Sequence, residues 1–508
     1  MGLFIFASGY FYKEYSEENV GRYILKKVKR LLVPFFLYNF VYALIAQILS
    51  LRGFNFGVGV TIDKLFVQPI INGHQYVYNL STWFVIPLFM VETVNVILHK
   101  FLKKIKHENI RECLYVFIAI STGMLGIWMS SKSYNTGWWL VIARLFHFLP
   151  FYAIGFIYKK YLKKYDKLPN SIYFAIILSI QLIIIIYKGG TLYYEQAWSK
   201  FSEFNAWPFV VGFLGIAFWL RIAKILEPSI GKSKLVNAIA DNTFSIMANQ
   251  FMGFMLVKAF FAYFYVHTDF LFQDFNWNEY HTSIWYYYFP KNLPQTSLIY
   301  AVVAILISIL IQKVINIVKN KFDILKYNSK QQKRVATFGL YILFLGAMVL
   351  PAKKISDYVE ANGGVVIPPA NTYTLGKELC FSASDANSDK YCISGFSSHE
   401  ETITWTDEKE AVMSFQIPEN EMKRDYELDI DCGAYGEGQD VDVYVNDTLV
   451  DKLYVNEDKT YQINFSLDLV TKNIIVRFEI PNAVSPAELG VSSDTRTLGL
   501  SIRKVIIK

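Results

Sequence analysis

Arg144 and His147 are the residues whose types and spacing most clearly allow chemistry. They lie three positions apart in an apolar stretch near 138–158, and residues three apart share one face of a helix. Ionisable residues inside a membrane cost about 2.5–3.5 kcal/mol on insertion scales, so those that occur there are candidates for function. A guanidinium can hold a phosphate or an oxyanion, and an imidazole can donate or accept a proton. We therefore predict a catalytic pair. The alternative is that Arg144 extends to the membrane surface and His147 makes an interhelical hydrogen bond.

A second candidate site is cationic. Lys29 and Arg30 end a basic stretch just before an apolar run near 31–51. Two adjacent cations at a helix start suit a ligand that carries several phosphates. The excess of basic residues in cytoplasmic loops predicts them equally well, so the sequence leaves both interpretations open.

Three tryptophans are candidates for substrate binding. Trp83 begins an apolar run, where it would be either an interfacial anchor or a wall of the site. Trp277 and Trp285 belong to an aromatic-rich segment, 266–296. This segment predicts either a belt of rings at the membrane surface or a platform for sugars, whose C–H faces pack on aromatic rings.

Other polar residues within apolar runs have structural interpretations. Glu92 needs a partner, either as part of a helix contact or in a polar cavity. Asn249 and Gln250 predict interhelical hydrogen bonds. The sequence contains no nucleophilic-serine elbow, no phosphate-cradling glycine loop and no Cys/His metal spacing. We expect ordinary surface positions for three histidines of the non-basic loops, which are His74, His267 and His281.

Composition separates the chain into two parts. The 508 residues are 53% hydrophobic and carry a net charge of +7. Residues 351–508 contain 27 acidic and 15 basic residues, a net charge of −12, which leaves 16 acidic and 35 basic residues, a net charge of +19, in 1–350. The bases of 1–350 occupy short loops between apolar runs. Membrane topology and lipid headgroups explain them, so nucleic acid is not expected as a partner.

The membrane part is predicted from apolar runs long enough to cross a bilayer, which takes about 20 residues. Met1–Tyr10 adds a shorter apolar stretch, which we expect to be the end of a helix that begins before this chain. Together these stretches predict an all-α polytopic membrane domain of about ten crossings. The long runs lie near 31–51, 79–98, 112–131, 138–158, 171–187, 207–223, 235–265, 297–318 and 335–350. The run 235–265 predicts either one long helix or a broken one.

The loops between these runs alternate in charge. Every second loop is basic, as in Lys13–Arg30 and Lys159–Lys167, and the loops between them are close to neutral. Basic loops lie in the cytoplasm, so the last run carries the chain outward. We therefore predict a multi-pass plasma-membrane protein whose acidic C-terminal part is extracytoplasmic.

The C-terminal part, 371–508, predicts an all-β domain, joined to the membrane domain 1–350 by a linker, 351–370. Its polar and apolar residues alternate, as in Asp440–Val445, which is typical of half-buried strands. Asn446-Asp447 then predicts a turn. Many short strands at even spacing predict a β-sandwich or jelly-roll-like fold.

The β domain offers few groups for chemistry, and we expect it to bind rather than to catalyse. Cys380 and Cys392 are close enough in sequence to be bridged, which leaves Cys432 unpaired. Four aspartates could chelate calcium, although a solvated acidic face explains them as well. They are Asp429, Asp431, Asp440 and Asp442.

Five short motifs are spread along 1–350. They are Phe4–Phe11, with Ser-Gly-aromatic near its end; Lys29–Pro34, with basic residues before a proline; Leu80–Phe84, a Trp-Phe helix start; Arg144–Phe151 with Gly155; and Asp241–Met247. In this order they resemble the acyltransferase 3 family of membrane acyltransferases. Each motif alone is weakly specific, and the order and spacing make the resemblance. In the β domain, Ser485–Gly499 resembles a short motif of accessory β-domains in bacterial surface-glycan proteins.

The resemblance implies a membrane O-acyltransferase of the cell envelope. It would transfer an acyl group, usually by O-acetylation from acetyl-CoA, to a hydroxyl of an extracytoplasmic polysaccharide, glycan or lipid-linked sugar. Acyl-CoA would be a donor substrate rather than a bound cofactor, and membrane lipids and the acceptor would be the partners. In this scheme the catalytic residues are Arg144 and His147, the acyl-CoA-binding residues are Lys29 and Arg30, and the acceptor-binding residues are Trp83, Trp277 and Trp285.

Two departures from the family bear on activity. The family's first helix carries an arginine and a histidine implicated in catalysis, and we expect that helix to precede this chain. The last motif often continues to a histidine in the family, where Asn249 and Gln250 stand here. A second hypothesis is therefore a non-enzymatic transporter or scaffold for a lipid-linked glycan.

Overall fold

The computed structural model describes the chain except for residues 191, 193, 202, 269–270, 273, 325–329, 369–371, 469–470 and 472. The end of the predicted linker, 351–370, therefore lies outside the described residues. The chain divides into two compact units. The first comprises Met1–Ile48, Gly57–Leu256 and Ser297–Tyr358, and the second comprises Leu49–Phe56, Val257–Thr296 and Val359–Lys508.

The predicted all-α membrane domain is confirmed. Within the described residues, nine helices are long and apolar enough to cross a membrane, and they coincide with the nine predicted runs. The α-helices are α1 (Gly2–Tyr10), α2 (Val20–Lys27), α3 (Val33–Ser50), α4 (Gln68–Asn72), α5 (Val85–Leu102), α6 (Glu108–Ser131), α7 (Gly137–Ile157), α8 (Asn170–Lys188), α9 (Trp207–Ile230), α10 (Lys234–Asp241), α11 (Thr243–His267), α12 (Trp277–Thr282), α13 (Thr296–Ile324) and α14 (Lys330–Ala361).

The predicted run 235–265 forms two helices rather than one. α10 ends at Asp241 because Asn242 leaves the helical conformation, with φ −104° and ψ 14°. The Asn242 side chain donates to the carbonyl oxygen of Ala238 at 2.7 Å. A short amide that bonds to the preceding turn competes with the backbone ladder and favours a helix end.

Two glycines allow α1 to pack closely against α7 in the first unit. A Cβ added at Gly9 would lie 2.0 Å from the Tyr152 carbonyl oxygen, and one added at Gly155 would lie 2.1 Å from the Phe6 carbonyl oxygen. Close approach through small residues is a main source of helix association in membranes. Gly9 and Gly155 belong to two of the five sequence motifs, so these two motifs meet in space.

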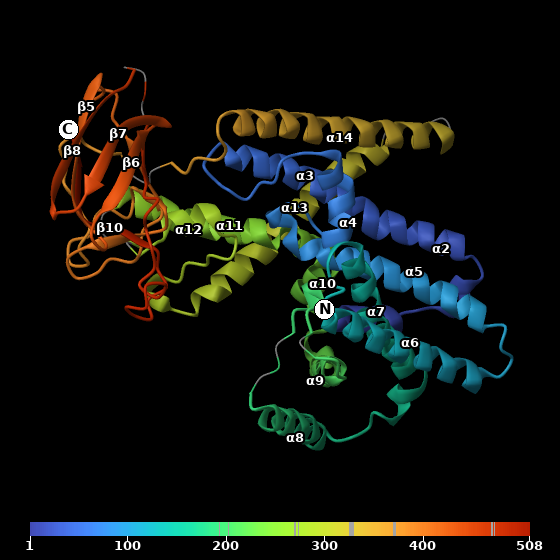
Figure 1. Cartoon of the computed structure of the whole chain (residues 1–508). Helices are drawn as coiled ribbons and strands as arrows, with labels where there is room; N and C mark the ends of the chain where they lie inside the picture. Colours follow the sequence, from blue (N-terminus) through green and yellow to red (C-terminus); the bar gives the residue numbers. More distant parts are fainter. Residues whose placement is uncertain are drawn as a thin grey trace. The chain divides into compact units, whose positions relative to one another are not determined.

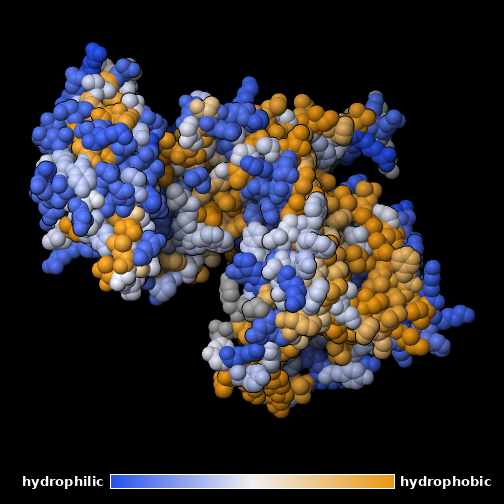
Figure 2. Space-filling model, in the orientation of Figure 1, coloured by the Kyte–Doolittle hydropathy of each residue, from blue (hydrophilic) through white to orange (hydrophobic). Residues whose placement is uncertain are grey.

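The helices of the first unit are apolar on their outer surfaces. Figure 2 shows hydrophobic residues over broad areas of the helical part, whereas the strand-rich part is largely hydrophilic. On α8, Ile172, Leu182 and Ile186 are exposed. A helix that is apolar on its exposed side is suited to lipid rather than to water.

The strands of the second unit form two five-stranded antiparallel sheets (Figure 1). They are β1 (Leu379–Cys380), β2 (Cys392–Ser394), β3 (Thr404–Asp407), β4 (Glu410–Gln416), β5 (Asp425–Ala434), β6 (Gln439–Val445), β7 (Thr448–Val455), β8 (Lys459–Ser466), β9 (Asn473–Glu479) and β10 (Leu498–Ile507).

The pairing of these strands defines a jelly roll. One sheet has the order β1-β10-β5-β8, with β3 also paired to β10, and the other has the order β2-β4-β9-β6-β7. The pairs β3–β10, β4–β9, β5–β8 and β6–β7 thus alternate between the two sheets, which is the winding of a jelly roll. The predicted sandwich is confirmed.

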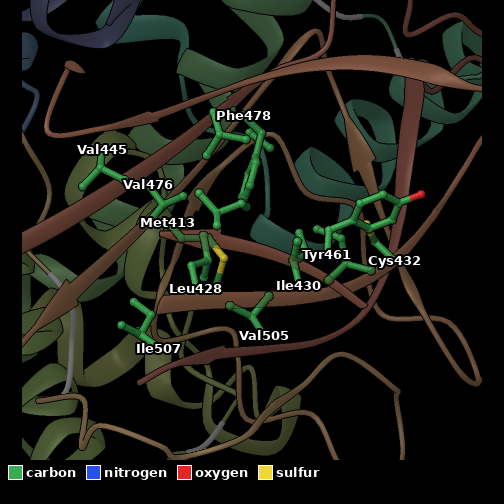
Figure 3. Packing of buried hydrophobic residues seen from close by; sticks show 14 of the residues in the cluster. Met413, Leu428, Ile430, Cys432, Val445, Tyr461, Val476, Phe478, Val505 and Ile507 are labelled. Atoms are coloured by element: carbon green, nitrogen blue, oxygen red, sulfur yellow. The ribbon is translucent and has the colours of Figure 1, made fainter. Parts of the chain in front are cut away.

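The jelly roll has a hydrophobic core of its own. Figure 3 shows Met413 from one sheet beside Leu428 from the other. Alternate residues of each strand point inward, as the period-two pattern predicts. All members of this core lie between Tyr373 and Ile507. Each large apolar side chain buried there stabilises the fold by about 1.5–3 kcal/mol.

The turn between β6 and β7 is the one predicted. Asn446 and Asp447 have positive φ values of 46° and 62°, which tight hairpin turns require and which Asn, Asp and Gly tolerate best. The Asn446 side chain accepts from the amide of Ile475 (2.8 Å) and donates to the carbonyl oxygen of Asn473 (3.1 Å). The turn is thereby tied to the neighbouring strand β9.

The structure does not gather the four aspartates considered for calcium. Two of them are on β5 and two on β6, and these strands belong to different sheets. Three pair with lysine or arginine, and Asp429 is 8% exposed rather than solvated. The pairs are Asp429–Lys508 (2.5 Å), Asp431–Arg503 (2.8 Å) and Asp442–Lys452 (2.7 Å).

The cysteines are free thiols in the structure, including Cys380 and Cys392. These two residues lie on β1 and β2, which belong to different sheets. Burial raises the pKa of the Cys392 thiol, and it raises the pKa of Cys432 to about 12. Buried thiols of this kind are inert at neutral pH.

The Ser485–Gly499 motif braces the loop before β10. The guanidinium of Arg496 donates to both carboxylate oxygens of Asp494, at 3.1 Å and 2.7 Å, and to Glu400 at 3.0 Å. The hydroxyl of Ser485 donates to the Asp494 carbonyl oxygen at 3.0 Å. Asp494 and Arg496 thus stabilise the loop internally, and Arg496 also ties it to the connection that contains Glu400.

His399 forms a hydrogen-bonded chain that requires a protonated ring. Thr404 donates its hydroxyl to the Phe381 carbonyl oxygen (2.7 Å), so it accepts from His399 Nδ1 (2.5 Å). His399 Nε2 lies 2.6 Å from Asp389 Oδ1. Both ring nitrogens then donate, which only the imidazolium can do. The hydrogen bond to Asp389 accordingly raises the pKa of His399.

We expect the hydrogen bonds of protonated His399 to stabilise the β domain at low pH. Because the folded-state pKa is raised above about 6.5, the stabilisation is complete below that pH and is lost as pH rises through the folded pKa. In acid, the free energy of unfolding of a 365–508 fragment should be larger than that of the same fragment with His399→Gln. The difference between the two fragments should shrink in mild base. Urea titrations at several pH values measure it, and a difference independent of pH would contradict the protonated chain.

Candidate active site

Arg144 lies in the first unit, on α7, and is 1% exposed. Its Nε donates to the carbonyl oxygen of Ala197 at 2.7 Å, and its Nη1 and Nη2 donate to the carbonyl oxygens of Ile71 and Asn72, each at 3.1 Å. Nη2 also donates to Ala197. The hydrogen bonds to Ile71 and Asn72 cap the C-terminal end of α4. A guanidinium has five N–H donors, and the bonds to these three carbonyl oxygens use four of them, so one donor remains for a ligand.

Trp83 lies beside Arg144, so the structure brings these two predicted residues together. The Arg144 guanidinium is 5.3 Å from the Trp83 ring centroid, and the Trp83 ring stacks on Phe148. The main chain at Gly73 packs directly on Trp83. A Cβ added there would lie 2.2 Å from Trp83 Cα, and Gly73 has a φ of +87°, which glycine adopts most easily.

His147 lies one turn further along α7 and is completely buried. Its ring stacks on Phe209 at 5.2 Å and lies 4.7 Å from the ring of Phe201. Neither ring nitrogen has a hydrogen-bond partner among the described residues. The interhelical hydrogen bond considered from the sequence is therefore not seen there, and the predicted catalytic role stays a prediction.

His74 is a candidate that sequence analysis treated as ordinary surface. Its ring is 6.5 Å from that of Trp198, which also lies against the Arg144 guanidinium at 5.8 Å. Burial, and then the charge of Arg144, lower the pKa of His74 to about 4. Its Nδ1 has no hydrogen-bond partner among the described residues. A neutral imidazole with a free nitrogen is suited to accept a proton.

Lys29 and Arg30 lie on a π-helical turn, Val28–Leu32. Both are exposed, and neither has an ion pair or hydrogen bond with any residue that the structure describes. The neighbouring Lys27 pairs with Glu92 at 2.5 Å. Glu92 is 3% exposed, so this ion pair supplies the partner that its burial requires.

Asn249 and Gln250 form the interhelical contacts predicted for them. The amide oxygen of Asn249, on α11, accepts from the Tyr42 hydroxyl of α3 at 2.8 Å, and its amide nitrogen donates to the Tyr38 hydroxyl at 3.2 Å. Gln250 donates to the hydroxyl of Ser81. Gln250 thus contacts the Leu80–Phe84 motif, two residues from Trp83.

Trp277 and Trp285 belong to the second unit and differ in exposure. The Trp277 indole donates to the carbonyl oxygen of Pro368 at 2.8 Å, and its ring lies 4.5 Å from that of His281. His281 is 2% exposed, so its expected surface position was wrong, and burial lowers its pKa to about 4. Trp285 is 62% exposed, as either an interfacial anchor or a sugar platform requires.

Lys258 was missed in the sequence. It lies on α11, within the second unit, and is completely buried. Its ammonium donates to the Ile284 carbonyl oxygen at 3.4 Å and lies 5.9 Å from the Phe56 ring. No carboxylate pairs with it in the described part of the chain. A lysine inside an apolar run is the same signal that singled out Arg144.

A cavity of about 340 Å³ lies among α5, α6 and α7 and is lined mainly by apolar side chains such as Leu98, Ile118 and Leu145. Its polar members are few, and Tyr115 donates to Asn95 there at 2.5 Å. The cavity is lined by neither Arg144 nor Trp83. Within the described residues, no three His, Cys, Asp or Glu side chains gather to form a metal site.

The nine long apolar helices found among the described residues, together with the jelly roll, define a multi-pass membrane protein with an attached β domain. The sequence matches the acyltransferase 3 family, described as an acyltransferase domain, over residues 1–313. The chain therefore belongs to this acyltransferase family, and the predicted resemblance is confirmed. The match contains the helices that carry Arg144, His147 and Trp83, and it ends before the jelly roll.

Comparison with curated proteins gives no match. Among solved structures, the chain is similar to an uncharacterized protein from Listeria monocytogenes EGD-e, in a crystal structure with α-D-glucose, β-D-glucose, magnesium and calcium and in a second crystal structure. Both share 18% identity and cover 23% and 22% of this chain, with TM-scores of 0.16 and 0.15. The similarity spans 10% of that protein's length.

Proposed function

We propose that this protein is a membrane O-acyltransferase that moves an acyl group, acetyl in the first instance, from acyl-CoA to a hydroxyl of a cell-surface glycan or glycolipid. The observation that carries the proposal is the family match over the helical residues 1–313. Those helices also contain the buried Arg144 and His147. The jelly roll lies outside the match and provides a separate surface for the acceptor.

The site around Arg144 is proposed as the acceptor end. Acyl transfer to a hydroxyl needs a base that takes the hydroxyl proton and a donor for the thioester oxyanion. His74 is neutral and has a free nitrogen, so it fits the base, and the remaining N–H of Arg144 fits the oxyanion. Trp83 forms a wall, and His147 remains a predicted catalytic residue. Trp277 and Trp285 remain predicted acceptor contacts of the second unit.

Lys29 and Arg30 are proposed to bind the phosphates of acyl-CoA, because they are exposed cations without protein partners. Replacing both by alanine should raise the KM for acetyl-CoA about tenfold, since contacts to phosphate at an exposed site contribute of the order of 1 kcal/mol. The kcat should change little. Initial rates in membrane vesicles measure both constants. The effect should disappear with S-acetylpantetheine, which lacks those phosphates, and Arg52→Ala should behave as wild type.

The charge pattern predicts that the basic loops lie in the cytoplasm and the jelly roll outside. A reporter active only in the periplasm should therefore be active when fused after residue 355 and inactive when fused after Lys163. Immunoblots of the fusions control for abundance. The reverse pattern would put the acceptor on the other side of the membrane.

The proposed activity is tested directly by surface chemistry. Cells that express the protein should carry alkali-labile acyl esters on their surface glycan, detected by NMR and mass spectrometry of the purified polysaccharide. Membranes should transfer label from acetyl-CoA to the same glycan. If the protein inserts normally and neither ester nor labelled glycan forms, the acyltransferase proposal fails.

The second hypothesis, a transporter or scaffold for a lipid-linked glycan, has one observation in its favour. Arg144 and Asn249 are both engaged in bonds that hold the helices together. Under this hypothesis the surface glycan would change in amount when the protein is removed, and its acylation would not. The same polysaccharide preparation distinguishes the two outcomes.

A further inference from the structure

On the outer face of the sheet that contains β3, β10, β5 and β8, a large aromatic residue lies in register with two very small residues. Ser501 of β10 is paired with Trp405 of β3 and with Gly433 of β5. Leu500 and Ile502 are buried in the core, and successive residues of a strand point to opposite faces. Trp405, Ser501 and Gly433 therefore lie in one row on the outer face.

The centre of this row is small, and a carboxylate lies over it. A Cβ added at Gly433 would lie 1.8 Å from Asp458 Oδ1 and 3.0 Å from Ser501 Oγ. Glycine inside a strand is unfavourable and often marks a place where another group approaches closely. Here that group is the Asp458 side chain, which is 72% exposed.

A guanidinium fixes the carboxylates on this side of the row. Arg503 donates from Nε and Nη2 to Asp431 Oδ1, at 3.1 Å and 2.8 Å, and its Nη1 lies 3.2 Å from Asp458. Two carboxylates and one guanidinium are therefore held in place before any ligand arrives. Such planar groups form paired hydrogen bonds with neighbouring hydroxyls.

Aromatic rings border the other side of the row. The rings of Trp405 and Tyr435 are 5.7 Å apart and nearly perpendicular, at 85°. The amide of Tyr435 donates to Gly499 of β10 at 2.8 Å, so the two rings flank the same strand. They form a corner in which one ring presents its face and the other its edge.

We infer that this outer face, from Trp405 and Tyr435 to Asp458 and Arg503, binds a pyranose unit of a neutral saccharide. The C–H face of a sugar ring packs on an aromatic face, and adjacent hydroxyls suit the carboxylates and the guanidinium. Two carboxylates against one guanidinium disfavour a phosphate or another anion. The inference deepens the proposed function, on which it rests, by assigning a place where the glycan acceptor is held.

The opposite sheet offers an internal comparison. Its outer face also has tyrosines, but the ring of Tyr444 is covered by the guanidinium of Arg477 at 4.1 Å from the ring centroid. Tyr454 of β7 is 57% exposed and lies at the edge of that sheet. Tyr454→Ala thus removes an exposed aromatic ring of the same domain without touching the proposed surface.

Binding is measured on the whole protein in lipid nanodiscs by saturation-transfer NMR. The probes are methyl α- and β-glucopyranoside and methyl β-galactopyranoside, with the acyclic polyol sorbitol as a control that lacks a flat C–H face. We expect transfer to the ring C–H protons of at least one pyranoside and none to sorbitol. Trp405→Ala should weaken binding about tenfold, whereas Trp405→Phe should retain much of it and Tyr454→Ala all of it.

Three outcomes overturn the inference: no pyranoside binds, sorbitol binds equally well, or Trp405→Ala and Tyr454→Ala bind alike. Thermal unfolding of each variant shows whether lost binding reflects a lost fold. If the alanine variant is unstable, the comparison of the pyranosides with sorbitol on the wild-type protein still tests the inference. Acyl transfer at saturating acceptor is measured in parallel. Normal transfer without pyranoside binding would reject this surface and leave the proposed acyltransferase activity standing.

Discussion

Gly155→Ala should sharply lower the amount of folded protein in the membrane. The added Cβ would lie 2.1 Å from the Phe6 carbonyl oxygen and 3.0 Å from the Tyr10 amide nitrogen. Both are backbone atoms of α1, which cannot rotate away as a side chain can. Separating α1 from α7 should cost about 3 kcal/mol or more, the upper range for overpacking.

The measurement is the fraction of detergent-solubilised protein that remains monodisperse after heating, together with abundance in membranes. Gly9→Ala should have a similar effect, because its Cβ would lie 2.0 Å from the Tyr152 carbonyl oxygen. Gly215→Ala on α9 is the matched control, since nothing lies within 4 Å of its added Cβ. Equal behaviour of Gly155→Ala and Gly215→Ala would contradict the close crossing of α1 and α7.

Arg144→Ala should abolish acyl transfer and also destabilise the membrane domain. The substitution leaves the carbonyl oxygens of Ile71, Asn72 and Ala197 without their donor, and each buried unsatisfied group costs about 1–3 kcal/mol. It also removes the cation from the face of Trp83. Arg144→Lys should retain little transfer, because a single ammonium cannot replace a planar fork that bonds to three carbonyl groups.

Arg221 supplies the control for stability. It is a second buried arginine, on α9, that donates to the Leu168 carbonyl oxygen at 3.0 Å and to the Asn170 side chain at 3.1 Å, and it pairs with Asp166. Arg221→Ala should lower thermal stability but leave transfer per folded molecule near that of wild type. Transfer is therefore normalised to monodisperse protein. If both alanine variants lose the same share of transfer per folded molecule, the specific role of Arg144 in transfer is rejected.

The two fold classes and most of their elements were predictable from local patterns in the sequence. Spanning helices depend on the length of apolar runs, and strands depend on alternation, and both are properties of neighbouring residues. The nine spans and the turn at Asn446-Asp447 were therefore predictable. The break at Asn242 was foreseen only as one of two possibilities, because propensity near a helix end is a weak signal.

The family, too, was predictable, because its motifs are short local patterns in a given order. Their physical meaning was not. Gly9 and Gly155 are 146 positions apart, and only the packing of α1 on α7 shows that they serve one contact. In the jelly roll, the motif residues Asp494 and Arg496 prove to brace a loop.

The candidate site was decided by tertiary structure. A charged residue in an apolar run signals that a partner is needed, but not which one, because the partner comes from another part of the chain. Glu92 pairs with Lys27, 65 positions earlier, and Arg144 bonds to carbonyl groups of residues 71, 72 and 197. Backbone carbonyls are the same in every residue, so their role as partners is invisible in a sequence. No local pattern distinguishes His74 either. It lies close to Arg144 because α4, which precedes it, packs against α7.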